Sequence, residues 1–226
     1  MNTIQQDKKT DVATAVSAKK ASVFYLFFKR AFDIISSFLA LILLSPVFLI
    51  LAILVKCEDG GRVFYSHERV GQKGKIIKVH KFRSMVKNSQ DLTALLTPEQ
   101  LEQYQKEFKI DDDPRITKIG KFLRTTSLDE LPQLWDILVG KISVVGPRPL
   151  VSAEIELYYS DQRDAFLACK PGLTGYWQAY ARNDATYESG ERQKMELYYV
   201  DHRSLWLDTK ILFKTVISVI TRKGAK

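Results

Sequence analysis

Two adjacent acids, Asp129 and Glu130, stand in the stretch SLDELPQ at 127–133 and could perform chemistry. Adjacent side chains on a helix point about 100° apart, so these acids do not pair across one helix face. Ser127 and Glu130 fit the capping-box pattern S-x-x-E, and acids suit the positive end of a helix dipole. Alternatively, one carboxylate attacks an electrophile while its neighbour holds a metal ion. Taken alone, the stretch favours the capping interpretation.

The apolar spacing from Leu128 to Val139 predicts a helix that ends at Gly140, with Pro132 in its first turn. The two acids would then lie at the N-terminus of this helix, where the backbone dipole favours negative charge. An aspartate kept ionised there can attack phosphorus, as carboxylates do in enzymes that form aspartyl-phosphates.

Candidate binding residues lie in two glycine- and proline-containing motifs. Arg148 stands between two prolines in SVVGPRP, and a backbone restrained in this way suits a guanidinium that grips phosphate oxygens. A solvated arginine in a surface turn is the equal alternative. The stretch KPGLTGYWQAYARND at 170–184 could stack a base or a sugar and offers Gln178 as a hydrogen-bonding group. An ordinary packed loop remains open as well.

The bulk composition restricts the class of protein. The 226 residues include 34 Lys+Arg and 26 Asp+Glu, a net charge of +8 that suits a polyanionic partner such as nucleic acid, anionic lipid or a phosphorylated small molecule. Cys57 and Cys169 are far apart, which indicates reduced thiols in a cytosol-facing protein. The histidines at 67, 80 and 202 do not cluster, so the sequence does not support a zinc site or a Ser-His-Asp triad.

A long apolar segment follows a polar N-terminal tail. Residues 1–22 lack periodicity and are predicted to be disordered. From Ile34 to Val55 there are 22 residues without a charge, and a straight helix of that length spans about 33 Å, enough to cross a bilayer core. Lys56, Cys57 and Glu58 follow instead of a cleavage site, so a signal peptide is not indicated.

Ser45 and Pro46 interrupt the middle of this segment. Pro46 has no N–H to donate, and the Ser45 hydroxyl is expected to bond back to the carbonyl of Leu41, which bends a helix. Positive residues, which mark the cytoplasmic side, stand on both flanks, at 29–30 and at 56, 62 and 69. A helix-break-helix hairpin that enters and leaves by the cytoplasmic face satisfies both observations; a straight span with a mild kink is the alternative. Asp33 is expected to pair with Lys29 or Arg30.

The remaining chain predicts an α+β fold that is mostly helical. Residues 62–66 and 75–80 are rich in β formers and predict a β-hairpin, residues 98–109 predict a helix, and DDDP before Pro114 predicts a turn. Residues 203–223 predict a C-terminal amphipathic helix that packs on the core or lies in the headgroup layer. We therefore expect a tail (1–22), a re-entrant membrane hairpin (23–58) and a compact cytosol-facing domain (59–226).

The order of the motifs resembles the bacterial sugar transferase family. The motifs are KRAFD, the apolar run with its central Ser-Pro, KFRSM, DPRITKIGKFLRTTSLDELPQ, VGPRP and PGLTGYWQ. The chain is similar to the small monotopic phosphoglycosyl transferases, of the undecaprenyl-phosphate sugar phosphotransferase type, over about residues 29–224. Larger relatives carry an extra N-terminal membrane region, and this chain resembles the short form that holds only the catalytic unit.

The resemblance implies a reaction. A sugar 1-phosphate would move from a UDP-sugar to polyprenyl phosphate, typically undecaprenyl phosphate, with release of UMP, as the first membrane step of exopolysaccharide, capsule or O-antigen synthesis. Asp129 would be the nucleophile that forms a covalent phosphosugar intermediate, and Glu130 would help to hold Mg²⁺. The resemblance also implies that Ser45 and Pro46 form the break of a re-entrant hairpin in the bacterial inner membrane, on its cytoplasmic face.

The same resemblance assigns binding residues. Arg83, Arg124 and Arg148 would bind phosphate oxygens, and Gln178 and Arg182 would lie near the nucleotide or sugar. Many relatives have Gly-Arg where this chain has Ala-Arg at 181–182, so the local loop shape could differ.

The expected partners are a UDP-sugar, polyprenyl phosphate and membrane lipids. The chain carries no nucleic-acid recognition motif, and its basic residues flank an apolar anchor. A homodimer is left open, and so is the sugar, for which galactose and glucose come first by resemblance. A catalytically silent membrane module that binds polyprenyl phosphate or partner proteins is the competing hypothesis.

Overall fold

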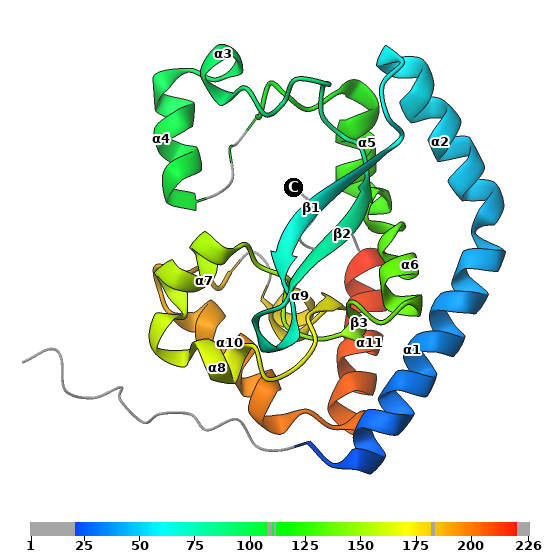
Figure 1. Ribbon diagram of the computed structural model, residues 1–226, viewed down its shortest axis with the longest axis vertical. Helices are drawn as coiled ribbons and strands as arrows, with labels where there is room; N and C mark the ends of the chain where they lie inside the picture. The colour runs from blue at the N-terminus through cyan, green and yellow to red at the C-terminus, as the bar shows by residue number, and fades with distance from the viewer. Residues whose placement is uncertain (1–20, 108–109, 111, 182–183, 221–226) are drawn as a thin grey trace, which may run out of the picture.

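Two N-terminal helices, α1 (Val23–Leu43) and α2 (Ser45–Asp59), form a bent pair along one side of the molecule (Figure 1). The computed structural model describes residues 21–107, 110, 112–181 and 184–220. Within these residues, no single helix is long and apolar enough to cross a membrane; α1 and α2 meet that criterion only together, by length and composition, and are bent by 63°. The predicted tail lies outside the described residues, apart from 21–22.

The break lies where the sequence predicts it. Leu44 ends α1, and Pro46 stands in the first turn of α2, where a missing N–H leaves no bond unmade. The Ser45 hydroxyl donates to the carbonyl of Ile42 at 2.8 Å and not to that of Leu41, because the chain already turns at Leu44. A left-handed glycine, Gly60 (φ 69°), ends α2.

Large apolar side chains of both helices point away from the rest of the protein. The exposed ones in α1 and α2 are Val23, Phe24, Leu26, Phe27, Phe28, Phe32, Ile34, Ile35, Phe38, Leu39, Ile42, Leu43, Leu49, Ile50, Ile53 and Leu54. Patches of this size are uncommon on a surface that faces water, so this face of the bent pair is a contact surface for apolar material.

Two cationic side chains of α1 bind it to the helices α6 (Gln133–Leu138) and α11 (Leu205–Ile220). Arg30 donates to the carbonyls of Ile137 and Leu138, both at 2.7 Å, and so caps the C-terminal end of α6. Lys29 forms a 2.7 Å ion pair with Asp208 of α11.

Asp33 of α1 is bonded differently from the expectation. Its Oδ1 accepts hydrogen bonds from the Ser143 hydroxyl at 3.0 Å and from the backbone N–H of Val144 at 2.9 Å. It therefore ties α1 to strand β3 (Ser143–Val145), while Lys29 and Arg30 are engaged elsewhere.

The predicted hairpin is confirmed. Strands β1 (Phe64–Val70) and β2 (Ile76–Phe82) pair antiparallel, with Phe64 opposite Phe82 and Val70 opposite Ile76. Both strands begin slightly later than the β-rich runs of the sequence and also end later, at Val70 and Phe82, which are buried. The hairpin crosses the middle of the view in Figure 1, with α5 and α6 between it and the bent pair.

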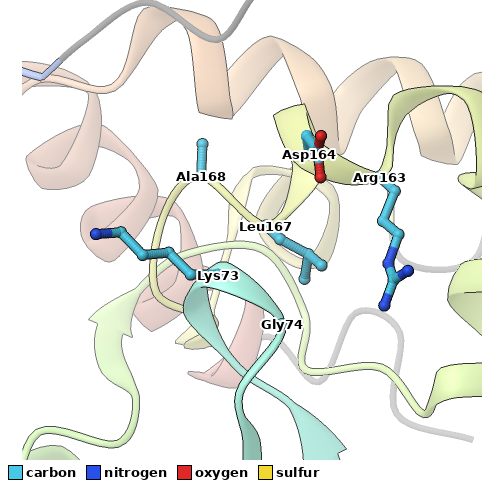
Figure 2. A pocket seen from close by; sticks show the side chains of 6 residues that line it. All are labelled: Lys73, Gly74, Arg163, Asp164, Leu167 and Ala168. Atoms are coloured by element: carbon cyan, nitrogen blue, oxygen red, sulfur yellow. The ribbon is translucent and has the colours of Figure 1, made fainter.

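The tip of the β-hairpin contacts the end of helix α8 (Arg163–Phe166). The single 3₁₀ turn η1 (Gln72–Gly74) forms the tip, and the N–H of Lys73 donates to the carbonyl of Leu167 at 2.9 Å. A cavity of about 350 Å³ lies here, with Lys73 and Arg163 on either side of Leu167 (Figure 2). It lies at the other end of the hairpin from Lys81.

The remaining elements complete a mostly helical α+β fold. They are α3 (Leu92–Leu95), α4 (Pro98–Glu107), α5 (Lys118–Thr126), η2 (Leu128–Glu130), α6 (Gln133–Leu138), α7 (Ser152–Tyr158), η3 (Ser160–Gln162), α8 (Arg163–Phe166), α9 (Tyr176–Tyr180), α10 (Glu191–His202) and α11 (Leu205–Ile220). Strand β3 pairs in parallel with β4 (Gly172–Thr174). The described part of DDDP, residues 112–114, contains turn residues as predicted; residue 111, and residues 108–109 of the predicted helix, lie outside the described residues.

The helix predicted over 128–139 is divided in two. Residues Leu128–Glu130 form the 3₁₀ turn η2, and α6 begins only at Gln133. Pro132 is the physical reason, since it cannot donate a hydrogen bond to the preceding turn. Gly140, at φ 87°, follows the end of α6 as predicted.

One apolar cluster joins the bent helix pair to the rest of the protein. Leu51 and Val55 of α2 pack with Phe82 of β2 and Leu123 of α5, and all four are buried. At the other end of the chain, α11 buries Ile211 but leaves Trp206, Phe213, Val216 and other apolar side chains exposed. This helix therefore packs on the core and also presents a second apolar face, so the two sequence interpretations of it are compatible.

We expect Leu123→Ala to lower the free energy of unfolding by about 2–5 kcal/mol, because it leaves a cavity where the bent pair meets β2 and α5. Thermal unfolding of the purified protein in detergent measures this. Leu157→Ala is the matched control, since Leu157 is 60% exposed on α7 and its loss creates no cavity. Equal effects of the two substitutions would contradict the packing described.

Candidate active site

The acidic pair lies in η2, between α5 and α6. Asp129 is buried, at 6% exposure, and Glu130 is half-buried. Ser127 ends α5 in the left-handed conformation (φ 57°), and its side chain makes no capping hydrogen bond. The predicted capping box is therefore wrong: the N–H of Glu130 bonds instead to the backbone carbonyl of Ser127, at 3.3 Å. The acids precede α6 and do not occupy its first turn.

Lys81 of β2 bridges the two carboxylates. Its Nζ lies 2.7 Å from Glu130 Oε1 and 3.5 Å from Asp129 Oδ2. Lys81 belongs to the KFRSM motif but is not among the residues predicted for the site. The available signal was its position at the end of a predicted strand, beside Arg83.

Side-chain charges, more than a helix dipole, govern the ionisation of Asp129. Burial raises the pKa of this carboxyl, the charge of Lys81 is the largest opposing influence, and Arg124 adds to that opposition. The neighbouring Glu130 charge raises the pKa further. A short 3₁₀ turn contributes little dipole, so the two cations are what favour the ionised, poorly hydrated form that a nucleophile requires.

A buried acid fixes the strand that carries Lys81. Asp136 of α6 is 0% exposed, and its Oδ2 accepts the backbone N–H of His80 at 2.8 Å. Its Oδ1 lies 2.8 Å from His80 Nδ1 and 3.0 Å from Lys141 Nζ. Because these bonds hold β2 against α6 one residue before Lys81, Asp136 positions the bridge. In the sequence, the available signal for this role was an acidic residue among the regularly spaced apolar positions of 128–139.

Of the predicted arginines, Arg124 is the one whose charge acts on Asp129. It lies in the last turn of α5. Its Nε donates to the Ser84 hydroxyl at 2.9 Å.

Arg83 is directed toward α2. Its Nη1 lies 2.5 Å from Asp59 Oδ2, its Nη2 is also bonded to Asp59, and its Nε donates to the carbonyl of Arg62 at 2.6 Å. Its side chain therefore connects the end of β2 to the end of α2.

Arg148 belongs to a second group of charges, on α7 and α10. Its backbone N–H donates to Glu196 Oε1 at 3.4 Å. Burial and the charge of Arg148 lower the pKa of Arg69, which lies 3.4 Å from Glu154. Arg148 therefore faces a mixed, partly buried ionic cluster.

In the aromatic segment at 170–184, the side chain of Trp177 is packed against its neighbours. The Arg192 guanidinium is sandwiched between the rings of Trp177 and Tyr187, 3.9 Å from each centroid, and the Trp177 indole N–H donates to the carbonyl of Ala185 at 2.9 Å. The amide oxygen of Gln178, on α9, is buried and has no hydrogen-bond partner within the described part of the chain.

Arg182, the other predicted residue of this segment, lies outside the described residues. Ala181 ends α9 with φ −148°, a conformation open to any residue. The loss of glycine at this position therefore imposes no backbone strain on Ala181.

The acidic pair suits a metal ion that is shared with a substrate. Within the described residues, no group of three or more His, Cys, Asp or Glu side chains could hold a metal. Mg²⁺ is commonly held by one or two carboxylates together with substrate phosphates, and Glu130 beside Asp129 supplies that donor set.

Comparison with known proteins identifies the family of this chain. The model of the bacterial sugar transferase family matches residues 24–222. The chain therefore belongs to the bacterial sugar transferase family, and the resemblance inferred from its motifs is confirmed.

Several curated relatives carry informative names. The undecaprenyl-phosphate galactose phosphotransferase of Salmonella typhimurium is 48% identical over 202 residues, which are 88% of this chain and 42% of that protein. The exopolysaccharide production protein ExoY of Sinorhizobium fredii is 44% identical over 200 residues, 87% of each chain. The UDP-glucose:undecaprenyl-phosphate glucose-1-phosphate transferase of Klebsiella pneumoniae is 42% identical over 203 residues, 88% of this chain and 41% of that protein. The chain thus spans less than half of some relatives and most of others.

Glu196 provides a pH-dependent test of the second charge cluster. Burial raises the pKa of its carboxyl from 4.5 to about 7. Between these values the unfolded chain has released the proton and the folded protein keeps it, so stability falls as pH rises and stays lower above pH 7. We expect Glu196→Gln to stabilise the protein more at pH 8 than at pH 5. The change that it causes in the free energy of unfolding should differ between the two pH values by a few kcal/mol, since one pKa unit is about 1.4 kcal/mol.

Thermal unfolding of both proteins at the two pH values measures this difference. Glu191→Gln, on the exposed side of the same helix, is the control and is expected to change stability equally at both. A pH-independent effect of Glu196→Gln would show that Glu196 does not titrate in this range.

Proposed function

We propose that this protein transfers a sugar 1-phosphate from a UDP-sugar to polyprenyl (undecaprenyl) phosphate through a covalent aspartyl intermediate, as the first membrane step of exopolysaccharide, capsule or O-antigen synthesis. The observation that carries the proposal is the buried Asp129, bridged by Lys81 to Glu130, in a chain of the bacterial sugar transferase family. The names of its relatives support the substrate classes.

In the first step, a carboxylate oxygen of Asp129 attacks the phosphorus that carries the sugar. The bond from this phosphorus to the bridging oxygen of UMP breaks, and UMP leaves with the electron pair. Lys81 would favour the ionised form of the attacking carboxylate, and Arg124 would bind a phosphate oxygen.

In the second step, a phosphate oxygen of the polyprenyl phosphate attacks the same phosphorus. Asp129 leaves as a carboxylate, and the product is a polyprenyl diphosphate sugar. Two displacements at one phosphorus thereby separate the release of UMP from the arrival of the lipid.

Other residues take supporting roles in this proposal. Glu130 would hold Mg²⁺, which would neutralise the diphosphate and assist the departure of UMP. Arg148, Gln178 and Arg182 would contact the nucleotide, the sugar or their phosphates. We assign Arg83 to the junction of β2 and α2, because its guanidinium is already engaged by Asp59.

We further infer that α1 and α2 form a re-entrant hairpin in the cytoplasmic leaflet of the bacterial inner membrane, with Ser45 and Pro46 at its deepest point. The 63° bend and the exposed apolar side chains support this placement. Cations at both ends, Lys29 and Arg30 before the apolar run and Lys56 after it, favour a return to the cytoplasmic side.

The reaction is tested by incubating the purified protein with Mg²⁺, polyprenyl phosphate and a panel of UDP-sugars, including UDP-galactose and UDP-glucose. We expect UMP release and a lipid-linked product from the wild type, loss of at least 10³-fold of that rate in Asp129→Asn, since a covalent nucleophile is removed, and loss of activity on chelation of Mg²⁺.

Mass spectrometry without lipid acceptor identifies the intermediate, which should add one sugar phosphate to the peptide that contains Asp129. Asp161→Asn, an exposed aspartate of η3, is the control and should retain activity. If wild type and Asp129→Asn are equally inert while UDP-sugar or polyprenyl phosphate still binds, the protein is a silent binding module.

The topology is tested by labelling single cysteines in oriented membrane vesicles. The native Cys57, as the single cysteine, marks the end of α2, where it is exposed. Val23→Cys, in a variant without native cysteines, marks the start of α1. We expect a membrane-impermeant reagent to label both from the cytoplasmic side, as it labels the control Ser152→Cys. Labelling of the two ends from opposite sides would establish a spanning segment.

A further inference from the structure

Ser84 stands directly after β2 and is 8% exposed. Its hydroxyl oxygen accepts the Nε–H of Arg124 at 2.9 Å. The contact joins KFRSM to the last turn of α5, the helix that leads into the acidic pair. Ser84 has no role in the reaction proposed above and is not among the residues predicted for the site.

The backbone of Ser84 brings α5 unusually close. Its carbonyl accepts the N–H of Thr117, which caps α5, at 3.1 Å. A Cβ at Gly120 would lie 2.0 Å from the same carbonyl oxygen, so only glycine permits this approach. Gly120 and Arg124 are four residues apart and share a helix face, so the close contact at Gly120 sets the reach of Arg124 to Ser84.

The charges around Arg124 do not fix its orientation. Partial desolvation lowers the pKa of its guanidinium, and the charges of Asp129 and Asp113 oppose that shift. Asp113, however, is engaged by Arg115, at 2.8 Å to Nε and 2.6 Å to Nη2. Ser84 is the neutral acceptor that holds the Nε–H of Arg124.

A neutral anchor has a specific chemical consequence. A carboxylate bound to Arg124 would cancel its charge and compete with phosphate, whereas a hydroxyl fixes the plane of the guanidinium and leaves the full charge. With Nε–H engaged, the terminal nitrogens form the fork that suits two phosphate oxygens.

We propose that Ser84 is a positioning residue that orients Arg124 for the diphosphate of the UDP-sugar. The inference rests on the proposed function in assigning that ligand. It predicts that Ser84 acts only through Arg124, which an energetic coupling between the two residues tests.

The experiment is a double-mutant cycle of Ser84→Ala and Arg124→Ala in the full-length protein. The KM for the UDP-sugar and kcat are measured, and the Kd of UDP is measured by calorimetry in an Asp129→Asn background, where no turnover occurs. We expect Ser84→Ala to raise KM and the Kd of UDP by about tenfold, the loss typical of a charge-assisted hydrogen bond, with a change in kcat below threefold. In the Arg124→Ala background, the same substitution should change neither value.

Two further variants separate positioning from folding. Ser84→Thr retains the hydroxyl and should restore UDP binding to within threefold of wild type. Thr125→Ala removes a hydroxyl that bonds only within α5, to the carbonyl of Lys121, and should leave KM unchanged.

The outcomes are distinguishable from a failure of the proposed function. The inference is overturned if Ser84→Ala leaves the Kd of UDP unchanged, if its effect is equal with and without Arg124, or if UDP does not bind the wild type. If UDP binding shows the predicted coupling but no UDP-sugar is turned over, the proposed reaction fails and the role of Ser84 stands.

Discussion

The contact between the ammonium of Lys81 and the carboxylates of Asp129 and Glu130 is the interaction on which the site depends. A buried aspartate resists ionisation, and Lys81 supplies the nearest opposing charge. This arrangement requires β2 to end beside η2. Asp136 secures that position by bonding both the backbone and the ring of His80. The carboxylate chemistry is thus prepared by contacts between segments about fifty residues apart in the chain.

The bent pair of helices α1 and α2 is held by contacts with the same elements. Arg30 caps α6 from one side, and Asp33 holds β3, so that α1 reaches into the domain with polar contacts while its apolar face points outward. Arg83 connects the end of β2 to Asp59 at the end of α2. Polar groups of both helices are thus hydrogen-bonded or ion-paired to the rest of the protein. If the helix pair lies in a bilayer, its depth would determine the distance of the acidic pair from the membrane surface.

Much of this could be predicted from the sequence. The interruption at Ser45-Pro46, the hairpin around residue 72 and the end of α6 at Gly140 follow from local chemistry, because proline, glycine and alternating β formers restrict the backbone wherever they occur. The capping role expected for Ser127 failed. An S-x-x-E pattern does not specify backbone conformation, and packing of α5 placed Ser127 in a left-handed turn.

The sequence by itself determined the break at Ser45-Pro46, the β-hairpin, the C-terminal helix and, through the order of its motifs, the family. The tertiary structure alone decided the neighbours of the arginines: the charge of Arg124 acts on Asp129, the guanidinium of Arg83 binds Asp59, and the backbone N–H of Arg148 bonds to Glu196 of α10. The physical reason is that local propensity acts over a few residues. The partner of a charged side chain depends instead on which elements pack together, and three arginines in similar motifs therefore have different neighbours.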